Sequence, residues 1–398
     1  MKNIMLSLRT NTRKDDFYVS LGGPVQQEIW IMLAKKGIYL FAGIGLFLGF
    51  LLERLANNEI QAVVFYVMPA IFSLLFCLAY DGKHTSKLCI SSLITSIFLT
   101  IPLVSFRFGF EPEYVNHHIC FLIAYPVFVY TVHSFHYAYH QKNTIKISYS
   151  SLFAAVWNTI PLLFIASIFL GVCQILFVFG AYVFQTVGNN YLWELYFGSY
   201  NFRLITNTTI FFIGIYIGNQ NTQIIYSLRL ILLRIMYYIF PVFAIISLLY
   251  LGLYIYYLST ISMPFSNNLH VIVPLSILGI IFFNAYFQDG EIDNWQKLWL
   301  KALLKIYRIT LFILVTMMGY HIFRDFSFDI NILVYLLSAV FLGFTYFISV
   351  FFSENKEKSW IKLGNVSTAM FFIFSLFLLN IPYYPVAFKI GTGGLVLN

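Results

Sequence analysis

The chain has 398 residues, of which 60% are hydrophobic, 20% are aromatic and only 10% are charged. Soluble domains average roughly 25% charged and 45–50% apolar residues, so this composition excludes an ordinary soluble domain and indicates lipid as the solvent. The net charge is +8, but the basic residues are spread over the segments between apolar runs. They do not form the single stripe of a nucleic-acid-binding surface, and we expect no nucleic-acid partner.

The apolar runs predict an all-α, polytopic helical membrane protein. Runs of about 17–25 apolar residues cross a bilayer as helices, and about eleven of them (ten to twelve) follow one another along the chain. They lie near 37–53, 60–80, 88–106, 118–138, 160–184, 204–219, 235–258, 268–287, 305–323, 330–352 and 364–381. We expect an amino-terminal segment (1–36), a single transmembrane helical domain (37–381) and a short external tail (382–398).

The positions of Lys and Arg predict the orientation. Residues 1–36 hold six basic residues and no apolar signal-peptide core, which fits a segment that stays in the cytoplasm. With the amino terminus inside, nineteen Lys and Arg fall on the inner side and five on the outer side. Cytoplasmic loops carry an excess of these residues, so we expect a cytoplasmic amino terminus in a bacterial inner membrane.

Two segments depart from the plain pattern of spans. Residues 151–185 as one helix would be about 52 Å long at 1.5 Å per residue, which is longer than the bilayer core. We therefore expect 151–159 to approach along the interface, with the span starting near Pro161. Residues 187–202 are aromatic and polar, which predicts a short re-entrant or surface helix on the outer face.

Glycines and prolines inside the apolar runs predict how the helices meet. Small residues four positions apart let two helix backbones approach closely, and such pairs occur at Gly45 and Gly49 and at Gly214 and Gly218. Prolines inside a span should kink or interrupt its helix. These prolines are Pro69, Pro102, Pro126, Pro241 and Pro274.

The stretch FFNAYFQDGEIDNWQK, residues 281–296, ends an apolar run with three carboxylates. Carboxylates can bind Mg²⁺ or Ca²⁺, but the calcium-loop pattern needs a Gly at its sixth position and a Glu at its twelfth, and neither is present. The other interpretation is a solvated turn that begins a basic interfacial helix. We treat the stretch as a candidate functional junction without metal, formed by Asn284, Gln288, Asp289, Gly290, Glu291 and Asp293.

Each part of this junction has an expected structural role. Asn284 and Gln288 lie one helical turn apart and can hydrogen-bond across helices as the span leaves the bilayer. Gly290 allows the turn. Asp293, or the neighbouring Asn294, can cap the next helix. A role for Asp289 does not follow from the turn, which makes it the first residue to test by mutation.

The sequence TVHSFHYAYH places His133, His136 and His140 on one face of a helix, at the cytoplasmic end of the fourth span. Histidines one turn apart can bind zinc or haem, but no Cys, Asp or Glu lies near them in the sequence. The pattern therefore favours an interfacial face with a structural or pH-sensitive role. We expect neither a metal nor another cofactor.

Carboxylates are missing from the depths of the predicted spans. Proton-driven transporters usually place a carboxylate or a His within the membrane, where charge is costly, so this absence counts against a carboxylate-based proton relay. The deep polar side chains are neutral and can equally bridge helices. They are Asn158, Gln174, Asn207, Thr208, Thr209 and Asn284.

The order of features between residues 148 and 352 resembles a known family. A Tyr…Phe…Trp-Asn segment opens a long span, FFIGIYIGN and SLRLILLRIMYYIFPVF follow, and FFNAYFQDGE closes an apolar span before NWQKLWLKALLKIYRITLF. This order is similar to the bacterial integral-membrane family called domain of unknown function 4153, in which an Asn-x-x-Tyr/Phe-Gln-Asp-Gly run ends a hydrophobic span. The resemblance implies a multi-span inner-membrane protein and assigns no activity or catalytic residue. The segment HIFRDFSFDI departs from the family pattern.

Three functions remain open from the sequence. The leading hypothesis is a permease-like or envelope-associated protein that handles a small or amphiphilic molecule, because several spans carry prolines and little of the chain lies outside the membrane. The rival is a non-transporting scaffold or sensor that docks a protein partner through its cytoplasmic loops. An intramembrane enzyme would need polar residues around one cavity, and the histidine face is the only such cluster in the sequence, so we do not expect an enzyme.

Overall fold

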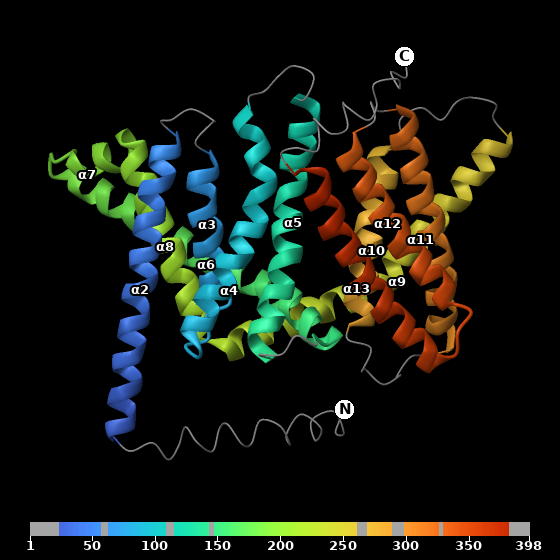
Figure 1. The fold of residues 1–398 in the computed structure, drawn as a ribbon, viewed down its shortest axis with the longest axis horizontal. Helices are drawn as coiled ribbons and strands as arrows, with labels where there is room; N and C mark the ends of the chain where they lie inside the picture. Colours follow the sequence, from blue (N-terminus) through green and yellow to red (C-terminus); the bar gives the residue numbers. More distant parts are fainter. Residues whose placement is uncertain are drawn as a thin grey trace.

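The computed structural model describes residues 24–56, 63–108, 115–142, 147–260, 269–288, 298–325 and 329–381. These residues form twelve α-helices, a 3-10 helix and a π-helix (Figure 1). The α-helices are α2 (Pro24–Ala56), α3 (Val63–Leu78), α4 (Thr85–Thr100), α5 (Val115–Lys142), α6 (Tyr149–Thr186), α7 (Tyr191–Trp193), α8 (Tyr200–Gln220), α9 (Thr222–Thr260), α10 (Leu269–Phe287), α11 (Leu298–Asp325), α12 (Ile330–Ser349) and α13 (Glu354–Leu379). The 3-10 helix is η2 (Ile101–Phe108) and the π-helix is η4 (Glu194–Gly198).

Each of the eleven predicted spans falls on one of these helices. Nine helices in the described part of the chain are long and apolar enough to cross a membrane, and α3 contributes a shorter apolar helix, Tyr66–Leu78. Helix α8, which carries the sixth predicted span, is not among these candidates. The first helix begins at Pro24, before the predicted start of the first span, and the tail 382–398 lies outside the described residues. The predicted outer segment 187–202 contains the two short helices α7 and η4.

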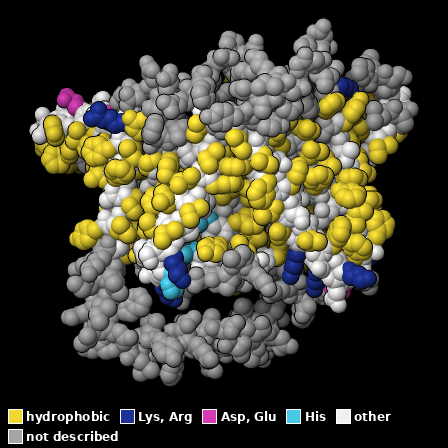
Figure 2. Space-filling model, in the orientation of Figure 1, with side chains coloured by type: hydrophobic (Ala, Val, Ile, Leu, Met, Phe, Trp, Pro, Cys, Tyr) yellow, Lys and Arg dark blue, Asp and Glu magenta, His cyan; other side chains and the backbone are white. Residues whose placement is uncertain are grey.

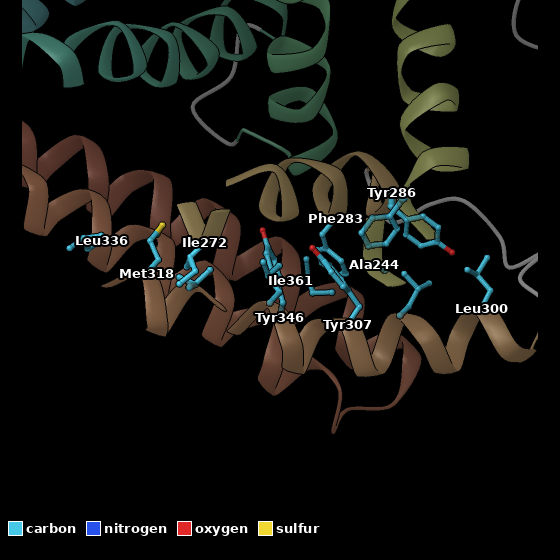
Figure 3. Packing of buried hydrophobic residues seen from close by; sticks show 14 residues of the cluster. Ala244, Ile272, Phe283, Tyr286, Leu300, Tyr307, Met318, Leu336, Tyr346 and Ile361 are labelled. Atoms are coloured by element: carbon cyan, nitrogen blue, oxygen red, sulfur yellow. The ribbon is translucent and has the colours of Figure 1, made fainter. Parts of the chain in front are cut away.

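The helices form two groups with α5 between them (Figure 1). In the amino-terminal lobe, α2 packs against α8 and α3, α6 packs against α8, and α3 packs against α4. In the carboxy-terminal lobe, α9, α10, α11, α12 and α13 pack against one another in chain order. Figure 3 shows the core of this second lobe, where Phe283, Tyr307, Tyr346 and Ile361 are buried together.

Glycine allows the closest helix contacts of the amino-terminal lobe. A Cβ atom on Gly45 would lie 2.8 Å from the Cα of Thr209 in α8, and one on Gly49 would lie 2.7 Å from the Cα of Ile205. A Cβ on Gly214 would lie 2.9 Å from the Cα of Ala166 in α6. Real Cβ atoms essentially never approach other atoms within 3.0 Å, so both predicted small-residue faces are confirmed as helix contacts.

The prolines have different effects on their helices. At Pro102 the prediction of an interruption is confirmed, because α4 ends at Thr100 and continues as η2 from Ile101. The other predicted positions lie inside helices that continue through them. Pro161 also lies inside α6.

Residues 151–159, which were expected to approach the span along the interface, belong to the same continuous helix as the residues after Pro161. These residues are the first turns of α6, and Leu152, Phe153, Trp157 and Thr159 are each no more than 8% exposed. Phe153 and Trp157 pack with Leu233 of α9 and Ala285 of α10. Neighbouring helices therefore cover this part of α6, and its position relative to a membrane interface stays a prediction.

A band of hydrophobic side chains covers the visible face of the molecule, with Lys and Arg at its edges (Figure 2). One face carries four arginines at helix ends. They are Arg54 at the end of α2, Arg107 at the end of η2, Arg203 at the start of α8 and Arg324 at the end of α11. Most other described Lys and Arg lie toward the opposite face, where α3, α5, α8 and α12 end and α4, α9, α11 and α13 begin. We call this opposite face the basic face.

Candidate functional site

Asn284, one of the predicted junction residues, belongs to a hydrogen-bonded ring near the basic face. Its Nδ2 donates to the Tyr346 hydroxyl (2.8 Å), which donates to Asn365 Oδ1 (2.9 Å), and Asn365 Nδ2 donates back to Asn284 Oδ1 (2.8 Å). Because the donors run in one direction around the ring, each bond polarises the next. The ring joins α10, α12 and α13.

Two further bonds complete the ring and attach a fourth helix. Asn284 Nδ2 also donates to the Ile280 carbonyl (3.0 Å), and Asn365 Nδ2 donates to the Tyr149 hydroxyl at the start of α6 (2.8 Å). An unsatisfied polar group costs roughly several kcal/mol in lipid. Because the ring pairs its polar groups with one another, it stabilises the packing of the four helices. The cross-helix bonding predicted for Asn284 is therefore confirmed.

Gln288, the second described residue of the predicted junction, ends α10 and forms no such bridge in the described part of the chain. Its N–H donates to the Asn284 carbonyl (2.9 Å), and its φ of 52° places it in the left-handed region that favours glycine. Gln288 therefore ends α10 in the left-handed conformation that is common at helix C-termini. Asp289, Gly290, Glu291 and Asp293 lie outside the described residues.

A buried ion pair lies beside the ring. Arg308 of α11 is 4% exposed, and its Nη1 donates to Glu357 Oε1 (2.8 Å) and to Ser349 Oγ (2.7 Å). The Ser349 hydroxyl donates to the Tyr346 carbonyl (2.6 Å), which connects the ion pair to the ring through α12. The Arg308 guanidinium also lies 5.9 Å from the centre of the Phe283 ring. We call these seven residues the polar junction: Tyr149, Asn284, Arg308, Tyr346, Ser349, Glu357 and Asn365.

The predicted histidine face lies inside the protein, between α4, α5 and α6. His133 and His136 are 2% and 5% exposed. The Nε2 atom of His136 lies 3.1 Å from Ser91 Oγ, and that of His133 lies 3.4 Å from Thr159 Oγ1. His140 Nε2 lies 3.5 Å from a carboxylate oxygen of Asp81. Within the described residues, no three His, Cys, Asp or Glu side chains are grouped to hold a metal ion.

A groove of about 370 Å³ lies between α12 and α13, next to the polar junction. Thr345, Ser367 and Thr368 supply hydroxyl groups to its lining, and Trp360 supplies an indole whose Nε1 donates to the Thr345 carbonyl (3.0 Å). The rest of the lining is Phe341, Phe344, Leu363, Gly364 and Phe371. Phe341, Phe344 and Leu363 are 41%, 45% and 62% exposed, so the groove opens toward the apolar band.

These features define a multi-pass helical membrane protein whose polar side chains gather near one face. No family model matches the chain, no curated protein matches it, and no solved structure matches it. The argument for a function therefore depends on the site itself.

The sequence did not predict most of the polar junction. Arg308 counted only as a topology signal, and Glu357, Tyr346 and Asn365 lie 49, 62 and 81 positions from the residues that they bond. Helical periodicity relates neighbours three or four apart, so such distant pairs leave no local pattern. The one available signal was an amide, Asn365, at the start of the last predicted span.

Replacing Tyr346 by Phe should lower the free energy of unfolding by about 1–3 kcal/mol. The change removes one hydroxyl and leaves an Asn284 donor and the Asn365 carbonyl oxygen unpaired in the interior. Tyr335→Phe is the matched control on the same helix, because the buried Tyr335 hydroxyl has no hydrogen-bond partner within the described residues. Denaturation in mixed micelles measures both, and equal effects would contradict the role of the ring.

Proposed function

We propose that this chain is a permease-like or envelope-associated protein of a bacterial inner membrane, and that the groove between α12 and α13 binds an amphiphile with an anionic headgroup. The groove is the observation that carries the proposal. Its volume of about 370 Å³ falls in the range of about 300–1,000 Å³ that ligand pockets occupy. Its lining combines aromatic rings with a few hydroxyl groups, which is typical of such pockets.

The distribution of the lining supports an apolar tail in the groove. Phe341 and Phe371 make an edge-to-face contact with ring centres 5.0 Å apart, and Phe344 and Leu363 expose their side chains beside them. An acyl chain of a bilayer lipid would reach this surface without leaving the apolar band. The Ser367 hydroxyl on the exposed side of α13 offers a hydrogen bond to an ester or a carboxyl group.

The end of the groove toward the basic face suits an anionic headgroup. Lys356 is exposed and lies four residues before Trp360, so both side chains project from one face of α13. Trp side chains prefer the level of the headgroups. A lysine near an anionic membrane surface contributes about 1 kcal/mol of attraction. A phosphate or a carboxylate next to Lys356 would therefore orient the amphiphile with its tail in the groove.

Native mass spectrometry of the full chain tests this proposal. Phosphatidylglycerol, oleate and phosphatidylcholine are added separately to the detergent-purified protein, and the bound fraction is measured. We expect both anionic lipids to exceed phosphatidylcholine, and the more strongly bound of the two identifies a phosphate or a carboxylate headgroup. Ser367→Trp should fill the groove and lower binding at least fivefold. Lys356→Gln should lower anionic binding about fivefold, which corresponds to about 1 kcal/mol.

Met370→Trp is the matched control for Ser367→Trp. Met370 lies on the same helix, is 38% exposed and does not line the groove, so the added indole should leave binding unchanged. Equal lipid binding by the unmodified chain and the three variants would contradict the proposal. It would favour the rival function, a non-transporting scaffold or sensor that docks a partner through its cytoplasmic loops.

Membership in the family called domain of unknown function 4153 is part of the proposal. The bonding of Asn284 supports it in one respect, because the family run that ends in Gln288, Asp289 and Gly290 begins at this residue. Asn284 packs the end of α10 against α12 and α13, which gives the first position of the run a structural purpose in this chain.

A further inference from the structure

The histidine face of α5 is the buried titratable cluster that the polar junction and the groove do not use. His133, His136 and His140 follow one another along one side of the helix, over about 10 Å at 1.5 Å per residue. The rings of His133 and His136 have centres 6.3 Å apart. His140, the last of the three, is nearest the basic face, where α5 ends at Lys142.

The partners of two histidines determine which ring nitrogen carries the proton. The Ser91 hydroxyl donates to the Leu88 carbonyl (3.1 Å), and the Thr159 hydroxyl donates to the Ala155 carbonyl (2.8 Å). Thr159 Oγ1 can therefore only accept from His133, so His133 carries hydrogen on Nε2. His136 Nε2 lies within reach of two hydroxyls, Ser91 Oγ at 3.1 Å and Ser92 Oγ at 3.3 Å, and hydrogen on this Nε2 is part of the proposal. Their Nδ1 atoms then present bare lone pairs.

Both Nδ1 atoms are buried, and neither has a hydrogen-bond partner within the described residues. A buried acceptor without a donor is unfavourable, and it needs an explanation in a native structure. Two such acceptors on consecutive turns of one helix form a repeated arrangement. A proton is the smallest ligand that satisfies a bare imidazole nitrogen, and it requires no cavity.

The face is connected to the surface at its basic end. Asp81, in the turn between α3 and α4, is 44% exposed at its side chain, and its carboxylate lies 3.5 Å from His140 Nε2. The carboxylate is held in place because Oδ1 accepts from the Lys83 N–H (2.7 Å). Solvent on the basic face therefore reaches Asp81, and Asp81 contacts the outermost histidine.

Other titratable and charged groups also face the histidines. On α4 the facing groups are the neutral hydroxyls of Ser91 and Ser92. On α5 itself, the Tyr137 ring contacts His133 edge-on, with centres 5.9 Å apart. On α6, Asn158 precedes Thr159 and accepts from Arg229 of α9 (3.0 Å). Asp81 supplies a carboxylate beside His140.

We propose that His133, His136 and His140 form a proton-uptake site that is filled from the basic face through Asp81. A hydronium ion gives up a proton to Asp81 or His140 and leaves as water. The proton then moves inward and forms an N–H bond at Nδ1 of His136 or His133, while the Nε2–H of that ring stays on its hydroxyl partner. Each step moves one proton and needs no other reactant.

This site does not use the groove between α12 and α13, so the two proposals can fail separately.

Nitrogen-15 NMR of histidine-labelled full chain in lipid nanodiscs tests the proposal. At pH 8 we expect His133 and His136 to carry hydrogen on Nε2 and a bare Nδ1. Exchange of the His136 ring proton with water should slow at least tenfold in His140→Gln and in Asp81→Asn. His84→Gln is the matched control, because His84 is exposed in the same turn and lies outside the face. Its exchange should match the unmodified chain.

Two results would overturn the proposal. One is hydrogen on Nδ1 of His133 or His136 at pH 8, because the lone pairs would then not be available. The other is an unchanged exchange rate at His136 in His140→Gln, because protons would then reach the ring by another route. The tautomer measurement uses only the unmodified chain, so it does not depend on the folding of a variant.

Discussion

Replacing Glu357 by Ala should lower the free energy of unfolding by about 3–5 kcal/mol, the usual cost of removing one partner from a buried ion pair. Arg308 is 4% exposed, and the Glu357 side chain that neutralises it is 24% exposed. Without Glu357, the guanidinium keeps the Ser349 hydroxyl but loses its counter-charge. Denaturation in mixed micelles, followed by circular dichroism, measures the change.

Glu354→Ala is the matched control for this experiment. Both acids lie in the first turn of α13, so both interact favourably with the positive end of the helix dipole. Glu354 is exposed, and its loss should cost less than about 1 kcal/mol. The double change of Arg308 to Met and Glu357 to Leu should recover most of the loss, because apolar residues can replace a buried pair. Equal effects of the two single changes would contradict the account of the polar junction.

Replacing Gly45 by Ala should lower the free energy of unfolding by about 1–3 kcal/mol, because one methyl group overpacks a tight contact. The new Cβ would lie 2.8 Å from the Cα of Thr209, and backbone cannot move aside as a flexible side chain can. Helices α2 and α8 would have to separate along the face that Gly49 shares. The same denaturation measurement applies.

Gly43→Ala is the control, since a Cβ at Gly43 meets no atom within 4 Å. There the higher helix propensity of Ala should act alone and stabilise the chain by up to about 1 kcal/mol. The two substitutions are chemically identical and only two residues apart, yet they should change stability in opposite directions. An unchanged or increased stability of Gly45→Ala would contradict the close contact between α2 and α8.

Composition and periodicity were sufficient to predict the helical elements. Eleven predicted spans fall on eleven helices, because the length and apolar character of a run can be recognised without knowing its neighbours in the fold. The contacts of Gly45 and Gly214 were also predictable, since small residues four apart mark the side of a helix that another can approach. Asn284 was found for a related reason, because it is an amide at the end of an apolar run.

The parts that sequence reasoning missed depend on tertiary packing. The packing of residues 151–159 against α9 and α10 could not be predicted, because the length of a helix does not show which neighbours pack against it. Arg308 counted as a topology signal, and only the fold shows that Glu357 neutralises it. The groove between α12 and α13 likewise exists only once Thr345 and Gly364 are packed together.

The most direct test of the proposed function is a cryo-electron microscopy map of the full chain in nanodiscs that contain phosphatidylglycerol. The account predicts lipid density in the groove between α12 and α13, with a tail beside Phe344 and a headgroup next to Lys356. A map in which Ser367 and Phe371 contact only disordered bilayer, while the surrounding helices are well defined, would contradict it.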